Sequence, residues 1–128
     1  MGAASIPNDV SVIEDSGCRW MARVLGADGD AIQQADVSSI AYSVYNKADL
    51  TTATATGTLV VSTVIYDTLQ TDSRWTEDST GYNFGWNVPA STFATGGVTY
   101  RIEVKITPAS GEAMHIVRDV PVVALARS

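Results

Sequence analysis

The sequence predicts an all-β protein, an antiparallel β-sandwich of about seven strands. The first reason is composition: the 128 residues include 15 Val, 8 Ile and 14 Thr, but only 5 Leu, 2 Lys and 4 Glu. β-branched side chains are stiff at χ1 and fit a pleated sheet better than a helix. The second reason is that several short segments alternate between apolar and polar residues. The third is that Gly, Pro and Asp turn signals separate these segments at the spacing of a sandwich.

The length predicts a single domain, which we place at residues 10–128. Residues 1–9 precede the first strand signal and contain Pro7. They form either an extended N-terminal arm or an ordinary frayed terminus.

The N-terminal part of the domain contains two predicted strands and a turn. Residues 10–13 form a short first strand, and residues 18–25 form a second. In the second strand Trp20, Ala22 and Val24 share the face that we expect to be buried, and Arg19, Met21 and Arg23 share the other. Residues 27–30 follow as a turn with Asp-Gly at its centre.

The next two predicted strands are less regular. Residues 40–45 form a strand with Ile40, Tyr42 and Val44 on one face. Another strand begins at residues 59–61 and can continue through residues 64–66. The Thr-rich stretch between them, residues 51–57, is either a polar loop or a weak edge strand.

An aromatic strand follows a long polar stretch that spans residues 67–81. Residues 82–88 alternate strictly, with Tyr82, Phe84, Trp86 and Val88 predicted to point inward and Asn83, Gly85 and Asn87 outward. Residues 89–93 read as one helical turn that carries Phe93 into one end of the core.

The clearest strand is residues 98–107, whose apolar face carries Val98, Tyr100, Ile102, Val104 and Ile106. One solvated face is typical of an antiparallel sheet. We expect Gly96 and Gly97 to form the turn before it. Residues 113–117 and 120–125 are predicted as the last strands. Pro121 cannot donate a ladder hydrogen bond, so it indicates an edge or a change of partner.

About seven short strands in this order resemble an immunoglobulin-like sandwich. Tyr100 lies near the start of a late strand, where such folds place a tyrosine that bonds back to the chain. Ile102 stands where antibody domains have their second cysteine, and the third strand lacks their core Trp. The pattern therefore indicates the broad architecture rather than an antibody domain, and a small jelly roll or barrel also fits.

Charge and composition exclude several classes of function. The net charge is −6, and the eight basic residues are scattered along the chain, so we expect no nucleic-acid partner. No apolar run approaches the ~18 to 20 residues that cross a bilayer, so we expect no membrane partner. A single cysteine and a terminus without a signal peptide predict folding in a reducing cytoplasm.

We find no catalytic residue set and expect neither an enzyme nor a cofactor. His115 is the only histidine and is interpreted as a surface strand residue, and Cys18 as a small core hydrophobe. Asp28, Gly29 and Asp30 are interpreted as a turn, with a loose calcium site shared with Asp36 as the alternative. An enzyme would need carboxylates from distant loops, such as Asp72, Glu77 and Asp28.

Arg74 and Trp75 lie in the longest polar stretch and are the best candidates for contact with a partner. Trp75 can cap the core from outside, anchor a protein interface or stack on a sugar ring. Ile6 and Pro7, in the predicted arm, complete the set of candidate partner-binding residues.

Four segments resemble small uncharacterised proteins of tailed bacteriophages: ADVSSI at residues 35–40, DTLQ at 67–70, RWTEDSTGYNF at 74–84 and VPASTF at 88–93. The resemblance covers about 90 residues, and that family has no established site residues to transfer. It implies an immunoglobulin-like virion component made in the bacterial cytoplasm. The expected role is a capsid decoration or auxiliary protein that binds the major capsid protein in many copies and catalyses no reaction.

Two other roles follow from the same observations. A tail, neck or baseplate adaptor would also be an immunoglobulin-like virion protein. A carbohydrate-binding module for surface attachment would use Trp75 as its stacking residue. In the leading hypothesis one sandwich face or edge strand, together with the N-terminal segment, docks on the capsid or on another copy.

Overall fold

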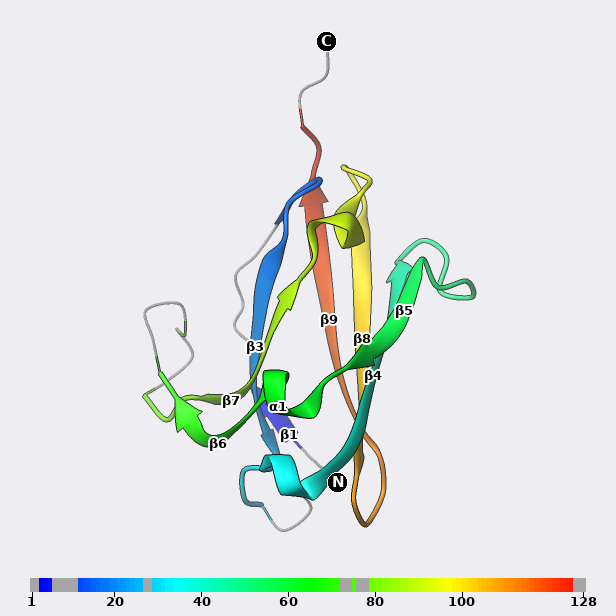
Figure 1. Ribbon diagram of the computed structural model, residues 1–128. Helices are drawn as coiled ribbons and strands as arrows, with labels where there is room; N and C mark the ends of the chain where they lie inside the picture. The colour runs from blue at the N-terminus through cyan, green and yellow to red at the C-terminus, as the bar shows by residue number, and fades with distance from the viewer. Residues whose placement is uncertain (1–2, 6–11, 27–28, 72–74, 76–78, 126–128) are drawn as a thin grey trace.

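The computed structural model describes residues 3–5, 12–26, 29–71, 75 and 79–125, and it is the all-β sandwich that the sequence predicts. Two sheets face each other across a hydrophobic core (Figure 1). The four-stranded sheet has the order β1-β3-β7-β6. Its strands are β1 (Ala3–Ser5), β3 (Cys18–Leu25), β6 (Ile65–Gln70) and β7 (Tyr82–Val88).

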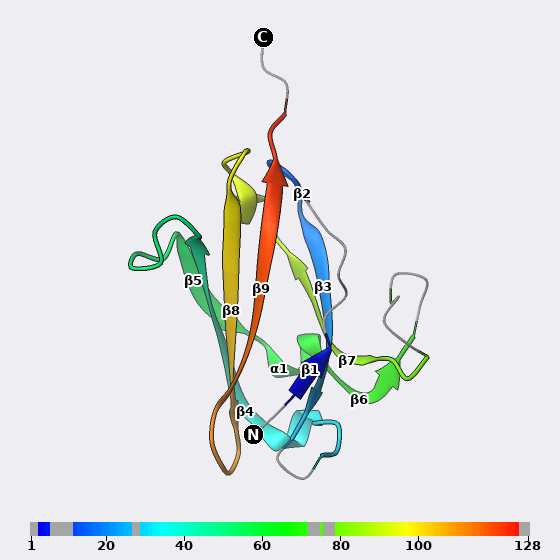
Figure 2. The same ribbon diagram turned by 180° about the vertical axis from the view of Figure 1, so that it is seen from behind.

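The five-stranded sheet has the order β2-β9-β8-β4-β5. Its strands are β2 (Val12–Ile13), β4 (Val37–Asn46), β5 (Ala55–Leu59), β8 (Thr99–Pro108) and β9 (Met114–Val123). Figure 2 shows β8 and β9 running the length of the molecule, with β5 at the outer edge. The 3-10 turns η1 (Gln34–Asp36) and η2 (Ala90–Phe93) and the helical turn α1 (Val61–Val64) connect the strands.

This strand order is immunoglobulin-like. An immunoglobulin domain has strands A, B, E and D in one sheet and C, F and G in the other. The order β1-β3-β7-β6 matches the first set, and β4, β8 and β9 match the second, with β5 and β2 added at its two edges. One pairing departs from the predicted antiparallel pattern, because β2 pairs with the end of β9 in parallel.

The predicted arm is only partly described. Ala3–Ser5 pair with the end of β3, from Ala3 opposite Leu25 to Ser5 opposite Arg23. These three residues are therefore a strand of the sheet rather than an arm. The remaining residues of the predicted arm, Ile6 and Pro7 among them, lie outside the described residues.

The prediction for residues 59–66 is wrong. Leu59 ends strand β5, which begins at Ala55, so residues 55–57 of the Thr-rich stretch form an edge strand and residues 51–54 a loop. The chain then forms α1 over Val61–Val64 and enters β6 at Ile65. The segment is rich in β-branched residues, but it must cross from one sheet to the other, and that tertiary requirement overrides strand propensity.

The last two predicted strands are one strand, β9, which runs from Met114 to Val123 through Pro121. The amide of Val122 donates to the carbonyl oxygen of Val98 at 2.9 Å, toward β8. Neighbouring residues of a strand direct their amides to opposite sides, so the nitrogen of Pro121 faces away from β8. The ladder between β8 and β9 therefore loses no hydrogen bond at Pro121. Beyond Pro121, β9 gains β2 as a second partner, as the proline indicated.

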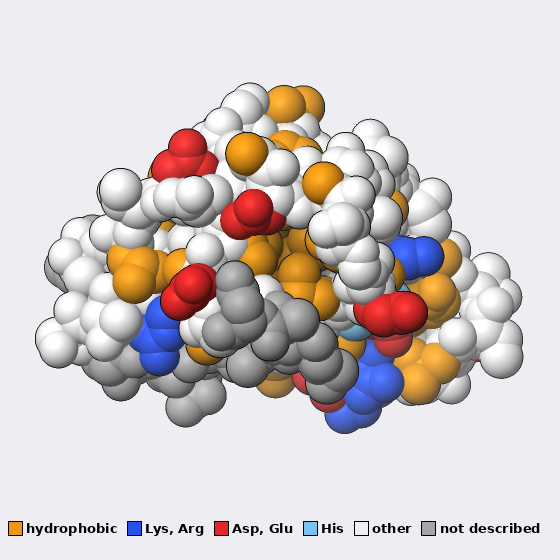
Figure 3. Space-filling view, turned by 90° about the horizontal axis from the view of Figure 1, so that it is seen from below, with side chains coloured by type: hydrophobic (Ala, Val, Ile, Leu, Met, Phe, Trp, Pro, Cys, Tyr) orange, Lys and Arg blue, Asp and Glu red, His pale blue; other side chains and the backbone are white. Residues whose placement is uncertain are grey.

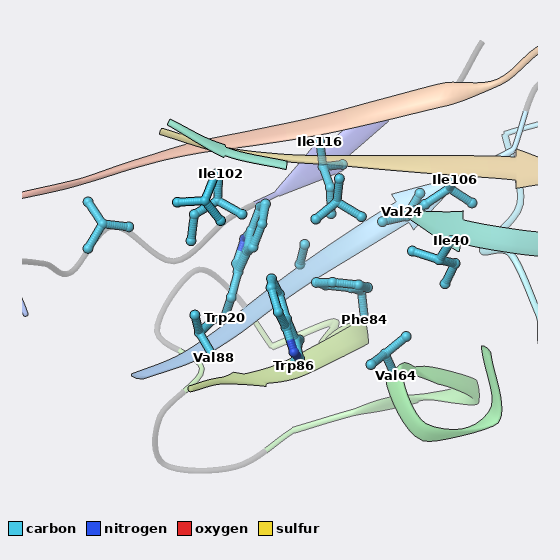
Figure 4. Close-up of a cluster of buried hydrophobic side chains, with 14 of the residues drawn as sticks. Trp20, Val24, Ile40, Val64, Phe84, Trp86, Val88, Ile102, Ile106 and Ile116 are labelled. Carbon is cyan, nitrogen blue, oxygen red and sulfur yellow. The ribbon is translucent and has the colours of Figure 1, made fainter. Parts of the chain in front are cut away.

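The core lies between the two sheets, and most predicted inward residues are in it. Figure 4 shows Trp20, Phe84 and Trp86 from the four-stranded sheet packed against Ile102 and Ile116 from the other. Trp20 and Phe84 meet edge to face, with their ring centroids 5.6 Å apart. A core shared by both sheets makes the sandwich one packed unit.

Phe93 closes one end of this core, as predicted, and Tyr100 lies beside it. Phe93 is fully buried on η2, and its ring lies 5.9 Å from that of Tyr100. The hydroxyl of Tyr100 accepts a hydrogen bond from the amide of Thr95 at 3.2 Å, five residues upstream. This is the tyrosine corner of immunoglobulin-like folds.

Strand β7 does not keep the strict alternation that was predicted. Tyr82 was expected in the core but lies on the outer face of the sheet, against Met21 and Trp75. Asn83 was expected at the surface but is 1% exposed, because the β6–β7 pairing is irregular between Ile65 and Gln70. Gly85 is also buried, under the guanidinium of Arg19.

Glu14 joins three parts of the chain at the end where β9 finishes. The side chain is 8% exposed. Its carboxylate oxygens accept hydrogen bonds from the amides of Gly96, at 3.2 Å, and Leu125, at 2.6 Å. The contact also depends on Gly96, where a Cβ atom would lie 2.3 Å from Cα of Ala124. Nothing in the sequence pattern pointed to this buried carboxylate.

Candidate functional site

Three of the four predicted contact residues, Ile6, Pro7 and Arg74, lie outside the described residues. The fourth, Trp75, is 6% exposed. Its indole packs on the outer face of the four-stranded sheet with Met21 and Tyr82, and Tyr66 borders the cluster. The ring centroids of Trp75 and Tyr82 are 5.5 Å apart. This burial matches the capping interpretation, and it covers the indole surface that a sugar or partner protein would need.

The other described residues that the sequence analysis singled out lie in strands and turns. His115 is exposed on β9, and Cys18 is half-buried against the core. Gly29 has a φ of 86° in the turn after β3, and Gly97 has a φ of 80° in the turn before β8. Asp28, Asp72 and Glu77 lie outside the described residues. Within the described residues no group of three or more His, Cys, Asp or Glu side chains is placed to hold a metal ion.

A concave site lies at one end of the sandwich, between the β3–β4 loop and the β8–β9 turn. Its volume is about 850 Å³, and residues from 26–36 and from 108–114 line it. In immunoglobulin variable domains the corresponding two loops contribute to the antigen-binding end. A volume of this size lies within the range of ligand pockets. We refer to it as the loop-end pocket.

The loop-end pocket combines an apolar lining with acidic side chains. Ile32 and Met114 are buried there, at 5% and 9% exposure, and Pro108 lies beside them. Asp30, Asp36 and Glu112 also line the pocket, and no Lys or Arg does so among the described residues. Figure 3 looks onto this end of the molecule and shows acidic side chains around a hollow in which hydrophobic side chains are visible.

The β3–β4 loop is held in place from the core side by Asn83. The amide oxygen of Asn83 accepts from the amide of Val24 at 2.7 Å. Its side-chain nitrogen donates to the carbonyl oxygens of Val24 and Ile32, both at 3.0 Å. The side chain thus supplies the hydrogen bonds that a neighbouring strand would supply, and it fixes the buried wall of the pocket at Ile32.

Three further hydrogen bonds hold the acidic wall. The carbonyl oxygen of Asp36 accepts from the amide of Ala109 at 2.9 Å, which joins the β3–β4 loop to the β8–β9 turn. The carboxylate of Asp36 caps the start of η1 by accepting from the amide of Gln33 at 2.9 Å. Asp67 on β6 accepts from the amide of Gln34 at 2.7 Å. These bonds hold the described walls of the pocket in the free chain, which lowers the cost of ordering them on binding.

A smaller hollow of about 360 Å³ lies at the side of the sandwich, between β5, α1 and β7. Arg19 donates there to Oδ1 of Asn87 at 3.0 Å and to the hydroxyl of Tyr66 at 2.8 Å. Partial burial disfavours the charged guanidinium, but the hydrogen bonds to Tyr66 and Tyr82 outweigh it and raise the pKa of Arg19. These bonds place Arg19 over Gly85 as part of the sheet surface.

Sequence reasoning missed the loop-end pocket. Residues 27–30, at one of its loops, were recognised only as a turn, because Asp and Gly are ordinary turn formers. The pocket exists because β3 and β8 end, and β4 and β9 begin, at the same end of the sandwich. The order of strands in the two sheets decides which loops meet there.

No protein-family model matches this chain, and neither a curated protein nor a solved structure matches it. Within the described residues no helix is long and apolar enough to span a membrane.

Proposed function

We propose that this chain is a structural protein of a tailed-phage virion that binds the capsid surface as a decoration or auxiliary protein. The support is the resemblance of four segments to virion proteins, together with an immunoglobulin-like fold of the kind that the resemblance implies. A protein that binds only the assembled shell stabilises it by mass action. The proposed activity is binding, without a catalytic step.

The observation that carries the binding role is the preformed loop-end pocket. Its acidic side chains, Asp30, Asp36 and Glu112, favour a partner segment that carries Lys or Arg. The aliphatic part of such a side chain would lie against Ile32 and Met114, while its charged group stays at the acidic edge. We therefore propose that a basic segment of the major capsid protein docks in this pocket.

Copy number in the purified particle tests the virion role. Quantitative mass spectrometry would compare this chain with the major capsid protein. Hundreds of copies per particle support the decoration role. About a dozen copies would move the protein to the tail, neck or baseplate, and absence from the particle would contradict any virion role and favour a surface-attachment module.

A pair of charge-neutralising substitutions tests the pocket separately. Binding to purified capsids that lack this protein would be measured for the wild type, for Asp30→Asn with Glu112→Gln, and for the control Glu103→Gln. Glu103 lies on β8, on the outer face of the five-stranded sheet. We expect the double variant to bind at least tenfold more weakly and the control to bind normally. Equal binding by all three proteins would remove the pocket from the proposal.

A further inference from the structure

Strand β5 is the outermost strand of the five-stranded sheet. It pairs with β4 from Ala55 opposite Val44 to Leu59 opposite Ile40. Among the described residues no strand pairs with its other side. Figures 1 and 2 show β5 beside β4 at the outer edge of this sheet. Since alternate residues of a strand direct their backbone groups to each side, this edge presents unpaired backbone groups.

The other strands at sheet edges carry features that limit further pairing. β1 has three residues and β2 has two. β6 has an irregular register between Ile65 and Gln70 and carries Asp67. By contrast, β5 has five residues in unbroken register, with no charged residue and no proline. Natural proteins usually protect a sheet edge by short length, charge, proline or a bulge. The β5 edge has no charge, no proline and no bulge.

The two faces of β5 differ in a way that suits a matching strand. Thr56 and Thr58 are exposed on the outer face, beside Ser43 and Ala41 of β4. Ala55 and Leu59 are on the inner face and pack against the core. A strand added to this edge would therefore meet short hydroxyl side chains on one face and apolar side chains on the other.

We propose that this edge binds a second copy of the chain, with two β5 strands paired antiparallel about a twofold axis at Gly57. Thr56 then lies opposite Thr58 of the partner subunit, and Ala55 lies opposite Leu59 of the partner subunit. A twofold axis brings identical strands together, so the edge must be complementary to itself. The β5 edge satisfies this requirement, because its Thr pairs and apolar pairs are both favourable across strands and no like charges face each other.

The dimer joins two five-stranded sheets into one continuous sheet. It leaves the loop-end pocket of each copy open, because the pocket is lined by residues 26–36 and 108–114 and β5 contributes none of them. The inference concerns the isolated chain and does not depend on the proposed virion role. Pairing of one short strand buries little area, so we expect an association that depends on concentration.

Sedimentation equilibrium of the purified chain tests the proposal. We expect the average mass to rise from 13.5 kDa toward twice that value as the concentration increases. Thr56→Lys with Thr58→Lys places like charges opposite each other and should keep the chain monomeric, as should Thr56→Glu with Thr58→Glu. An equimolar mixture of the two variants should restore the dimer, because Lys then faces Glu. Ser91→Lys with Ala94→Lys, at exposed positions on and beside η2, is the control and should dimerise like the wild type.

Hydrogen exchange of the wild type gives a second measurement that needs no variant. Backbone amides of β5 should exchange more slowly at high concentration than at low concentration. A wild type that stays monomeric at every concentration would overturn the proposal. So would a dimer that both charged variants still form, or a dimer in which β5 gains no protection.

Discussion

Asn83 supports the backbone at the pocket end of the sandwich from its buried side. Its side chain is 1% exposed and hydrogen-bonds to the backbone of Val24 and Ile32, where β7 no longer pairs with β3. Buried backbone groups need partners, and here one amide side chain supplies them. From the sequence, Asn83 was assigned to the surface because its neighbours alternate. The irregular register of β6 against β7 reverses that assignment.

We expect Asn83→Leu to destabilise the fold by about 3 kcal/mol, because it leaves one buried amide and two buried carbonyl groups without their partner. Urea denaturation followed by circular dichroism measures the loss. A change below 0.5 kcal/mol, taken here as about the size of an ordinary surface substitution, would contradict this role.

Asn83→Asp is the matched variant, because it keeps the shape and the acceptor for Val24 but loses the amide donor. Burial disfavours the carboxylate, so the folded state binds its proton more tightly than the unfolded state. Relative to the wild type, the variant should therefore be most stable below the ordinary pKa of Asp, ~3.9, and lose stability as the pH rises through the higher folded value. Urea denaturation at several pH values would reveal this slope.

Trp75 is likewise buried although the residues around it in the sequence are polar. The indole packs against Tyr82 and Met21, so we expect Trp75→Ala to lower the free energy of unfolding by about 3 kcal/mol. Trp75→Phe keeps a ring beside Tyr82 and should lose less. Thermal denaturation of the two variants checks the order, and equal stability of Trp75→Ala and the wild type would contradict the capping role.

At the scale of elements, a charged cluster connects β4, β8 and β9 on the outer face of the five-stranded sheet. Asp119 accepts from Nε of Arg101 at 3.0 Å and from Nζ of Lys47 at 2.8 Å. Hydrogen bonds from Arg101 and then Lys47 lower the pKa of Asp119 below its ordinary value. The turn after β4 is thereby tied to β8 and β9.

The cluster makes stability depend on acid pH. Because the pKa of Asp119 is lower in the folded state, its stabilisation is present above the unfolded value, ~3.9, and is lost as the pH falls through the folded value. The side chain is 34% exposed, so the contribution is below about 1 kcal/mol. We expect Asp119→Asn to be less stable than the wild type at pH 7 and equally stable at pH 2, as measured by urea denaturation. Equal stability at pH 7 would contradict the prediction.

Element boundaries followed from the sequence where a strand lies deep in a sheet. The prediction for β3 is correct at both ends, and so is that for β7, because apolar alternation and turn residues coincide there. The prediction that a strand starting at residues 59–61 continues through residues 64–66 was wrong, since a segment of Val, Thr and Ile carries the same signal in a strand and in a crossing between sheets. Pro121 was interpreted correctly as a sign of a change of partner, but the predicted break between residues 113–117 and 120–125 was wrong, because β9 runs through it.

At the scale of the whole molecule, one core cluster contains residues of both sheets, with Trp20 and Trp86 inside it. Neither sheet can lose its partner without exposing that core, so we expect a single cooperative unfolding transition. Tryptophan fluorescence and far-ultraviolet circular dichroism should give the same urea midpoint. Two separate transitions would contradict a single core, and Trp75→Phe checks that the fluorescence reports Trp20 and Trp86.

The sequence by itself determined the all-β class, the sandwich and most of the buried face of each long strand. These follow from β-branched composition and from the two-residue period of strands, which are local properties of the chain. The tertiary structure alone decided that β2 runs parallel to β9, that Asn83 and Glu14 are buried, and that two distant turns form the loop-end pocket. Those features depend on which strands become neighbours, and residues far apart in sequence decide that together.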